Sequence, residues 1–125
     1  MTAPALPIWR TGAIWVVFAA LETAAQLTLK MAAGTTASEL STGAWLGALA
    51  TNPWFQLSIA CDMANFFAWM AILRRHDLSL AIPLSSICYF AIIAAGTVFL
   101  HESVAVAQWV GLIVIGVGLA LISWK

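Results

Sequence analysis

Acidic residues inside apolar segments are the side chains of this sequence whose type and position indicate chemistry. Glu22 lies about ten residues into an apolar run that begins near Gly12. A helix rises about 1.5 Å per residue, so its carboxylate would lie roughly 15 Å deep, near the middle of a bilayer. An ionised carboxylate there costs roughly 2.5–3.5 kcal/mol, and such residues normally face a cavity, a partner or a substrate path. We predict that Glu22 binds a cation or a proton; the alternative is a structural partner of Lys30 or of a polar group on another span.

Asp62 is a second acid of this kind, eight residues past Trp54 in a later apolar run. Asn65 and Trp69 follow it at i+3 and i+7 and therefore share its helix face. Two acids at similar depth on neighbouring helices predict a cation or proton site, in which the two carboxyls could also share one proton. The alternative for Asn65 is a hydrogen bond between helices, which membrane bundles use.

Polar residues extend from Glu22 toward one membrane surface. Gln26 and Lys30 follow it at i+4 and i+8 on the same helix face. A lysine at this position could bind a phosphate group, or it could anchor the helix by extending to the interface. Arg74 and Arg75, between two later runs, are interpreted in the same way.

A proline lies in the third apolar run. Pro83 has no N–H and clashes with the carbonyl one turn earlier, so it predicts a helix kink. Kinked helices beside a cavity are where transporters place binding groups and hinges. Ser86 and Tyr89, beyond the kink, are candidate hydrogen-bonding residues of the same site.

The composition predicts the elements that position these residues. Of 125 residues, 63% are hydrophobic and 8% are charged, whereas a soluble domain has roughly 25% charged residues. The apolar runs are about as long as the roughly 20 residues that a transmembrane helix needs. We therefore predict an all-α membrane protein, a single domain of four transmembrane helices with short loops. The spans cover about residues 12–30, 54–73, 78–100 and 104–124, and an interfacial helix is expected between the first two.

Basic residues near the span ends predict the orientation of the chain. Arg10, Arg74, Arg75 and Lys125 would lie on one side of the membrane and Lys30 on the other. The positive-inside rule then places both termini in the cytoplasm. The run that follows Arg10 is interpreted as a retained first span rather than a signal peptide, because it contains Glu22 and continues to Lys30.

Small residues lie on one face of the fourth span. Ala107, Gly111 and Gly118 follow helical spacing, and small residues let helix backbones approach closely. We interpret this face as a site of helix packing or dimerisation.

Several classes of function are excluded by what the sequence lacks. The net charge is zero, which does not fit a nucleic-acid-binding surface. Cys61 and Cys88 lie inside apolar runs and are interpreted as free thiols. With no metal-ligand spacing of histidines and cysteines and no nucleophile beside a base, we expect no metal, no cofactor and no enzymatic activity.

Several short motifs follow one another in the second half of the chain: Trp69 and Leu73, "AIPLSS" at 81–86, "HE" at 101–102 and "QWVGLIVIGVGLALI" at 108–122. Through these motifs the chain, from about Ser58 to Ile122, resembles the small four-helix branch of the drug/metabolite transporter superfamily. The likeness is greatest to the subunits of the 4-amino-4-deoxy-L-arabinose-phosphoundecaprenol flippase, to which "AQLTLKMA" at 25–32 also fits. The resemblance implies a multi-pass protein of the bacterial inner membrane that acts as a transporter or flippase.

The first span also resembles the small multidrug resistance proteins, in which a membrane glutamate precedes a lysine by eight residues, as Glu22 precedes Lys30 here. In those proteins the glutamate exchanges protons for a cationic substrate, and two copies form one pathway. The flippase subunits generally lack this acid, and Asp62 has no known counterpart in either group. The sequence therefore combines features of both groups.

Together these observations predict a flippase or transporter of an amphiphile with a cationic head, such as a lipid-linked amino sugar. Glu22 and Asp62 would bind the cation, with Asn65, Ser86 and Tyr89 as hydrogen-bonding partners. One alternative is a proton-coupled exporter of small soluble cations, and another is an accessory membrane subunit that does not transport. Four helices form a narrow pathway, so a homodimer or a heterodimer with a related chain is expected.

Overall fold

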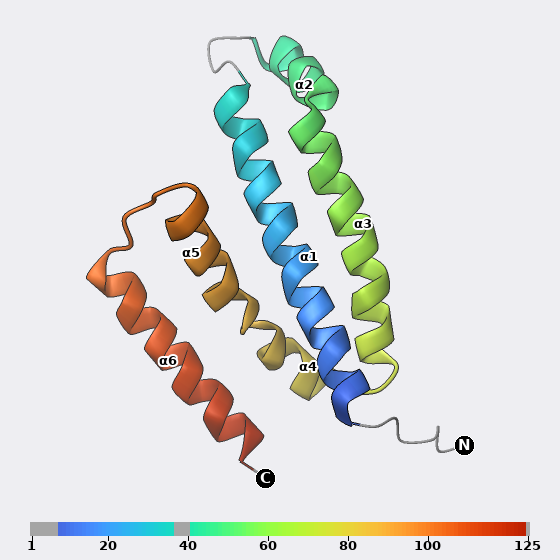
Figure 1. Ribbon diagram of the computed structural model, residues 1–125, viewed down its shortest axis with the longest axis vertical. Coiled ribbons are helices and arrows are strands. Elements are labelled where there is room, and N and C mark those ends of the chain that lie inside the picture. Colours follow the sequence, from blue (N-terminus) through green and yellow to red (C-terminus); the bar gives the residue numbers. More distant parts are fainter. Residues whose placement is uncertain (1–7, 37–40, 125) are drawn as a thin grey trace.

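The computed structural model describes residues 8–36 and 41–124 of the chain as six helices (Figure 1). They are α1 (Ile8–Thr35), α2 (Thr42–Thr51), α3 (Pro53–Leu73), α4 (Leu78–Ser85), α5 (Cys88–Phe99) and α6 (Val106–Ser123). The segments Gly12–Thr35, Pro53–Leu73 and Leu78–Phe99 are long and apolar enough to cross a membrane, and Val106–Ile122 is a shorter apolar helix. The predicted class, an all-helical membrane protein with about four apolar helices, is confirmed.

The helices α1 and α3 form the most extensive pair, because small residues let them approach closely. Ala25 and Ser58 are fully buried where the two helices meet, and the Ser58 hydroxyl donates a hydrogen bond of 3.0 Å to the Ala25 carbonyl. At the far end, Asn52 caps α3 by accepting from the Trp54 N–H at 3.0 Å. The Asn52 amide also donates to the Thr35 hydroxyl at 2.9 Å. These contacts fix α3 alongside α1.

The third apolar run is broken into two helices near Pro83. Pro83 lies inside α4, which ends at Ser85, and α5 begins at Cys88. Across the break, the N–H groups of Ser86 and Ile87 bond to carbonyls three residues back, those of Pro83 and Leu84, which is the tighter 3₁₀ pattern. The break changes the direction of the chain between α4 and α5 (Figure 1).

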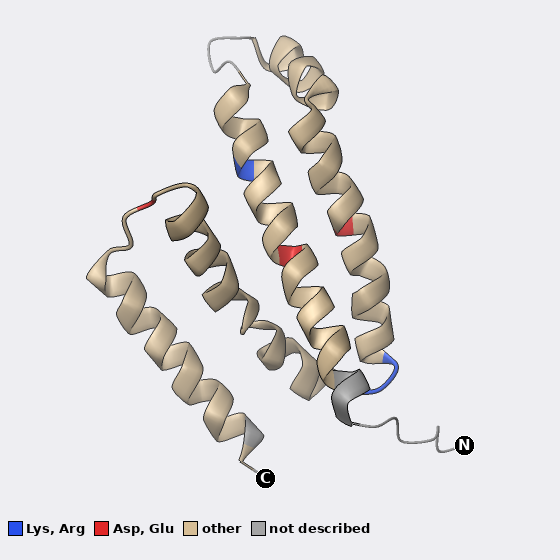
Figure 2. Cartoon of the chain, in the orientation of Figure 1, with Lys and Arg blue, Asp and Glu red and all other residues tan. Residues whose placement is uncertain are grey.

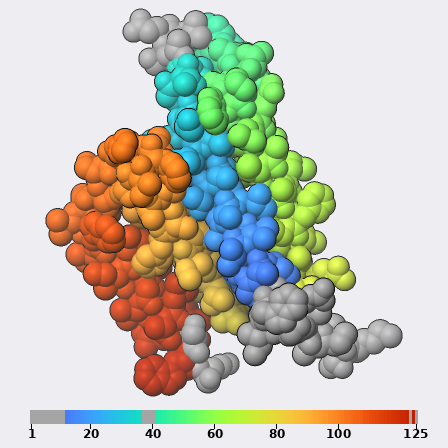
Figure 3. All heavy atoms as spheres, viewed as in Figure 1, coloured from blue at the N-terminus to red at the C-terminus, as the bar shows by residue number. Residues whose placement is uncertain are grey.

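The central helix is α1, with α3 on one side and α5 with the α5–α6 connection on the other (Figure 3). Phe18, Ile72, Ala81 and Cys88 form a small buried cluster at their junction. Most other large apolar side chains are exposed on the outside of the bundle, as lipid contact requires.

The sixth helix packs loosely within the chain. Leu112 is its buried residue, whereas Ala107 and Gly111 are exposed. A Cβ atom added at Gly111 or Gly118 would meet nothing within 4 Å. The predicted small-residue face therefore does not serve packing inside the described part of this chain, and its role in dimerisation stays a prediction.

The charged loops lie at opposite ends of the bundle (Figure 2). Arg74 and Arg75 follow α3 at one end, and Glu102 lies in the α5–α6 connection at the other. Lys125 and the side chain of Arg10, which also contribute to the predicted orientation, lie outside the described residues.

Candidate functional site

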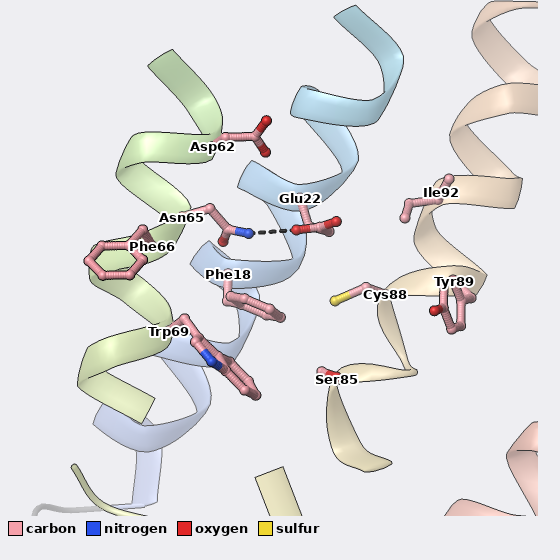
Figure 4. Close-up of a pocket in the computed structure, with 10 residues that line it drawn as sticks. All are labelled: Phe18, Glu22, Asp62, Asn65, Phe66, Trp69, Ser85, Cys88, Tyr89 and Ile92. Carbon is pink, nitrogen blue, oxygen red and sulfur yellow. Dashed lines mark hydrogen bonds between the residues drawn. The ribbon is translucent and has the colours of Figure 1, made fainter. Parts of the chain in front are cut away.

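A cavity of about 370 Å³ opens between α1, α3 and the α4–α5 break (Figure 4). Its walls combine two acids with aromatic and small polar side chains. The lining residues are Phe18, Glu22, Asp62, Asn65, Phe66, Trp69, Ser85, Cys88, Tyr89 and Ile92.

Both oxygens of the Glu22 carboxylate accept hydrogen bonds. The Asn65 amide on α3 donates to Oε2 at 2.6 Å, and the Gln26 amide, one turn along α1, donates to Oε1 at 3.3 Å. Hydrogen bonds to an ionised acceptor are roughly twice as strong as those between neutral groups. Of the two structural partners considered for Glu22, the structure therefore provides the polar group of another span and not Lys30.

Asn65 has an unused acceptor beside this carboxylate. Its side chain is buried, yet its Oδ1 has no hydrogen-bond partner among the described residues. Buried carbonyl oxygens are almost always satisfied by protein or water. The atom is closed to solvent, so it is an unsatisfied acceptor beside Glu22 rather than an open contact point for a ligand.

Asp62 lines the same cavity from α3, about one helical turn from Asn65. Unlike Glu22, which is half-buried, it is exposed. The structure thus brings both predicted acids to one cavity, together with Asn65, Trp69 and Tyr89.

Aromatic rings cover much of the remaining wall. Phe18 of α1 and Trp69 of α3 contact each other with ring centroids 5.3 Å apart, and Phe66 and Tyr89 complete the set. Aromatic faces attract cations that come within about 6 Å of the ring centroid. The combination of carboxylates and rings suits an organic ammonium group.

Some lining residues were not predicted. Phe18 precedes Glu22 by four residues, and this spacing could have indicated it. Cys88 and Ile92 of α5 line the wall opposite α3 (Figure 4), where the sequence offered no signal. The serine that lines the cavity is Ser85 and not the predicted Ser86, because α4 ends at Ser85 and Ser86 lies in the turn.

A second cavity of about 310 Å³ lies farther along α1 toward the α5–α6 connection. Gln26 and Lys30 line it from α1, and Glu102 lines it from the connection. Lys30 forms an ion pair with Glu102 there, a contact that the sequence did not predict. Arg74 and Arg75 are exposed and line neither cavity.

No metal site is evident in the described ranges 8–36 and 41–124, where no group of three histidine, cysteine, aspartate or glutamate residues comes close enough to hold an ion.

The chain is similar to bacterial proteins that are each named as a probable 4-amino-4-deoxy-L-arabinose-phosphoundecaprenol flippase subunit, ArnE. The protein of Aeromonas hydrophila is 31% identical over 72 residues, which cover 58% of this chain and 63% of the relative. That of Pseudomonas syringae is 32% identical over 76 residues, or 61% of this chain and 70% of the relative. That of Klebsiella pneumoniae is 32% identical over 66 residues, or 51% and 59%. No protein-family model matches the chain, and no solved structure matches it.

Proposed function

The chain belongs to the family of the 4-amino-4-deoxy-L-arabinose-phosphoundecaprenol flippase subunits named ArnE, and from this we propose that it is a subunit of a flippase. Its substrate is an amphiphile with a cationic head, and a lipid-linked amino sugar is the first candidate. The observation that carries the proposal is the cavity that joins Glu22 and Asp62 to aromatic walls.

The chemistry of the cavity supports a cationic head. Two carboxylates supply the charge, and Phe18, Trp69 and Tyr89 supply apolar and π surface. The relatives are named as flippase subunits, so the proposed activity is transport.

The surroundings of the cavity support a lipid-linked substrate and a second chain. Apolar side chains such as Phe66 and Tyr89 are exposed at the cavity and on the outside of the bundle, so an attached lipid tail could remain in the bilayer. The small-residue face of α6 is open. We therefore propose a dimer, either of two copies or with a related subunit. It would lie in the bacterial inner membrane, and the excess of basic residues on one side of the spans supports an orientation with both termini in the cytoplasm.

The test is translocation of a fluorescent polyprenyl-phosphate amino sugar by the purified protein in liposomes. Glu22→Gln is expected to retain the fold and to abolish flipping, because the amide keeps the size and removes the charge. Asp77→Asn makes the same chemical change at an exposed residue outside the cavity, where the side chain makes no capping bond. This control variant should flip at the wild-type rate.

The outcomes separate the candidate functions. Wild-type activity in Glu22→Gln would remove Glu22 from the mechanism. If the wild type does not flip the lipid but takes up a small soluble cation with release of protons, the protein is a proton-coupled exporter. If neither activity appears unless a related chain is added, and Glu22→Gln supports that chain equally well, the protein is an accessory subunit.

A further inference from the structure

The ion pair between Lys30 and Glu102 connects two parts of the chain that are 72 residues apart. Lys30 donates from α1, and Glu102 accepts from the connection between α5 and α6. Their side chains are 56% and 42% exposed. The pair is therefore open to the outside of the bundle rather than enclosed by it, and ion pairs this exposed contribute little to stability.

The backbone nevertheless holds Glu102 in place. The preceding residue, His101, has φ 53°, a left-handed conformation that residues other than glycine seldom adopt. The Glu102 N–H donates to the Gly96 carbonyl at 3.3 Å, so the connection folds back over the end of α5. A Cβ atom on Gly96 would lie 3.2 Å from the Glu102 carboxylate. The absence of a side chain at Gly96 therefore lets this carboxylate lie against α5 and reach Lys30.

The pair lies in line with the cationic site. Lys30 follows Glu22 by eight residues on the same helix face, which is roughly 12 Å along the helix. Gln26 lies between them; it bonds to Glu22 and lines the second cavity, and Ile92 lines both cavities. A ligand whose cation lies at Glu22 can therefore extend along α1 and place an anion at Lys30.

We infer that the Glu102 carboxylate competes with the anionic group of the substrate for binding to Lys30. When the second cavity is empty, the Glu102 carboxylate neutralises Lys30. When the substrate binds, the phosphate that joins its head to a prenyl chain takes this place and frees Glu102, which releases the α5–α6 connection from α1. The cationic head is already bound at Glu22, so the phosphate acts at a high effective concentration and can displace a carboxylate of similar charge. The inference rests on the proposed function, because it assigns the anionic end of the same substrate.

The test measures binding of farnesyl phosphate, and of farnesol as the uncharged control, to the purified chain in dodecyl maltoside micelles, whose neutral head carries neither charge of the proposed substrate. Farnesyl phosphate has no cationic head, so its binding reports the Lys30 subsite alone, without the gain in effective concentration that a tethered head would give. The wild type should prefer the phosphate, and Lys30→Gln should lose this preference. Glu102→Gln should bind farnesyl phosphate more tightly, by about 1.5- to fivefold, the range expected when an exposed competing ion pair is removed. Its affinity for farnesol should not change. In a Lys30→Gln background the same substitution should have no effect on either ligand.

Two further measurements keep the test decisive. Thermal unfolding of each variant shows whether it is folded, and Glu102→Asp, which keeps the charge on a shorter side chain, should shift binding in the same direction by a smaller factor. Inorganic phosphate at the same concentration should not displace farnesyl phosphate; equal competition would reject a lipid-linked anion in favour of a soluble phosphate.

Unchanged or weaker binding by Glu102→Gln would overturn the competitor role. If Lys30→Gln still lost the preference for phosphate, the proposed function would remain intact. Equal binding of the phosphate and the alcohol by the wild type would reject the anion subsite at Lys30. The liposome assay with Glu22→Gln would still decide the proposed function independently.

Discussion

Replacing Asn65 with leucine separates a structural role of Glu22 from a functional one. The substitution keeps the size of the side chain and removes both of its polar atoms. In the wild type, Nδ2 donates to Glu22 at 2.6 Å while Oδ1 is buried without a partner among the described residues. A hydrogen bond to a charged group contributes about 1.5–3 kcal/mol, whereas an unsatisfied buried acceptor costs about 1–3 kcal/mol. The two terms oppose each other, so the free energy of unfolding of Asn65→Leu should lie within about 2 kcal/mol of the wild-type value.

Transport should respond differently, because no such offset applies to it. Glu22 would keep the weaker bond from Gln26, at 3.3 Å, and lose the one that orients it toward α3. Even the lower limit for a charged hydrogen bond corresponds to roughly a tenfold change, since tenfold is about 1.4 kcal/mol. We therefore expect the initial rate of lipid flipping in liposomes to fall at least about tenfold.

The matched control for this experiment is Gln56→Leu, which makes the same amide-to-leucine change on α3 outside the cavity. It should flip lipid at the wild-type rate. Two results would refute the reasoning. Full transport by Asn65→Leu would mean that the orientation of Glu22 is irrelevant to function. If Asn65→Leu were several kcal/mol less stable than the wild type but each folded molecule still transported at the wild-type rate, the Asn65–Glu22 contact would have a structural role only.

Two other predictions follow from the packing of the helices. Gly111→Leu should abolish dimer crosslinking and leave thermal unfolding in detergent unchanged, because nothing in the described chain lies within 4 Å of a Cβ there. The control is Ala120→Leu, the same kind of enlargement at an exposed residue on the opposite face of α6, and this variant should keep the dimer. If the dimer also survives Gly111→Leu, the interface lies elsewhere. Asn52→Ala removes the cap of α3 and the contact with Thr35 and should lower the free energy of unfolding by about 1 kcal/mol, measured by chemical denaturation. An unchanged value would show that these end contacts do not fix α3 to α1.

The sequence was sufficient to predict the helices and one wall of the cavity. The apolar runs are long and separated by clear turn signals, so their length predicts spans. Asp62, Asn65 and Trp69 were placed together because positions three, four and seven apart share a face of a helix. Glu22 was placed near them because its position in the first span matches that of Asp62 in depth.

The opposite wall could not be predicted, because it depends on how the chain turns after Pro83. A proline predicts a kink but neither its exact position nor the rotation of the helix that follows. This rotation decides that Ser85 lines the cavity in place of Ser86, and that Cys88 and Ile92 face α1. The pair of Lys30 and Glu102 was missed for a related reason, since its partners are 72 residues apart and no local pattern connects them.

The environments of the two acids suggest that they have different parts in the proposed transport. Glu22 is half-buried, and both of its oxygens already accept hydrogen bonds from Asn65 and Gln26; these bonds lower the cost of placing a carboxylate in an apolar segment. A structural role alone could therefore explain Glu22. Asp62 is exposed into the same cavity, where a charge adds nothing to helix packing and is costly in lipid. A cationic ligand explains both acids at once, because it would neutralise Asp62 and bind to the oriented carboxylate of Glu22. For this reason we prefer the transport function to a purely structural role.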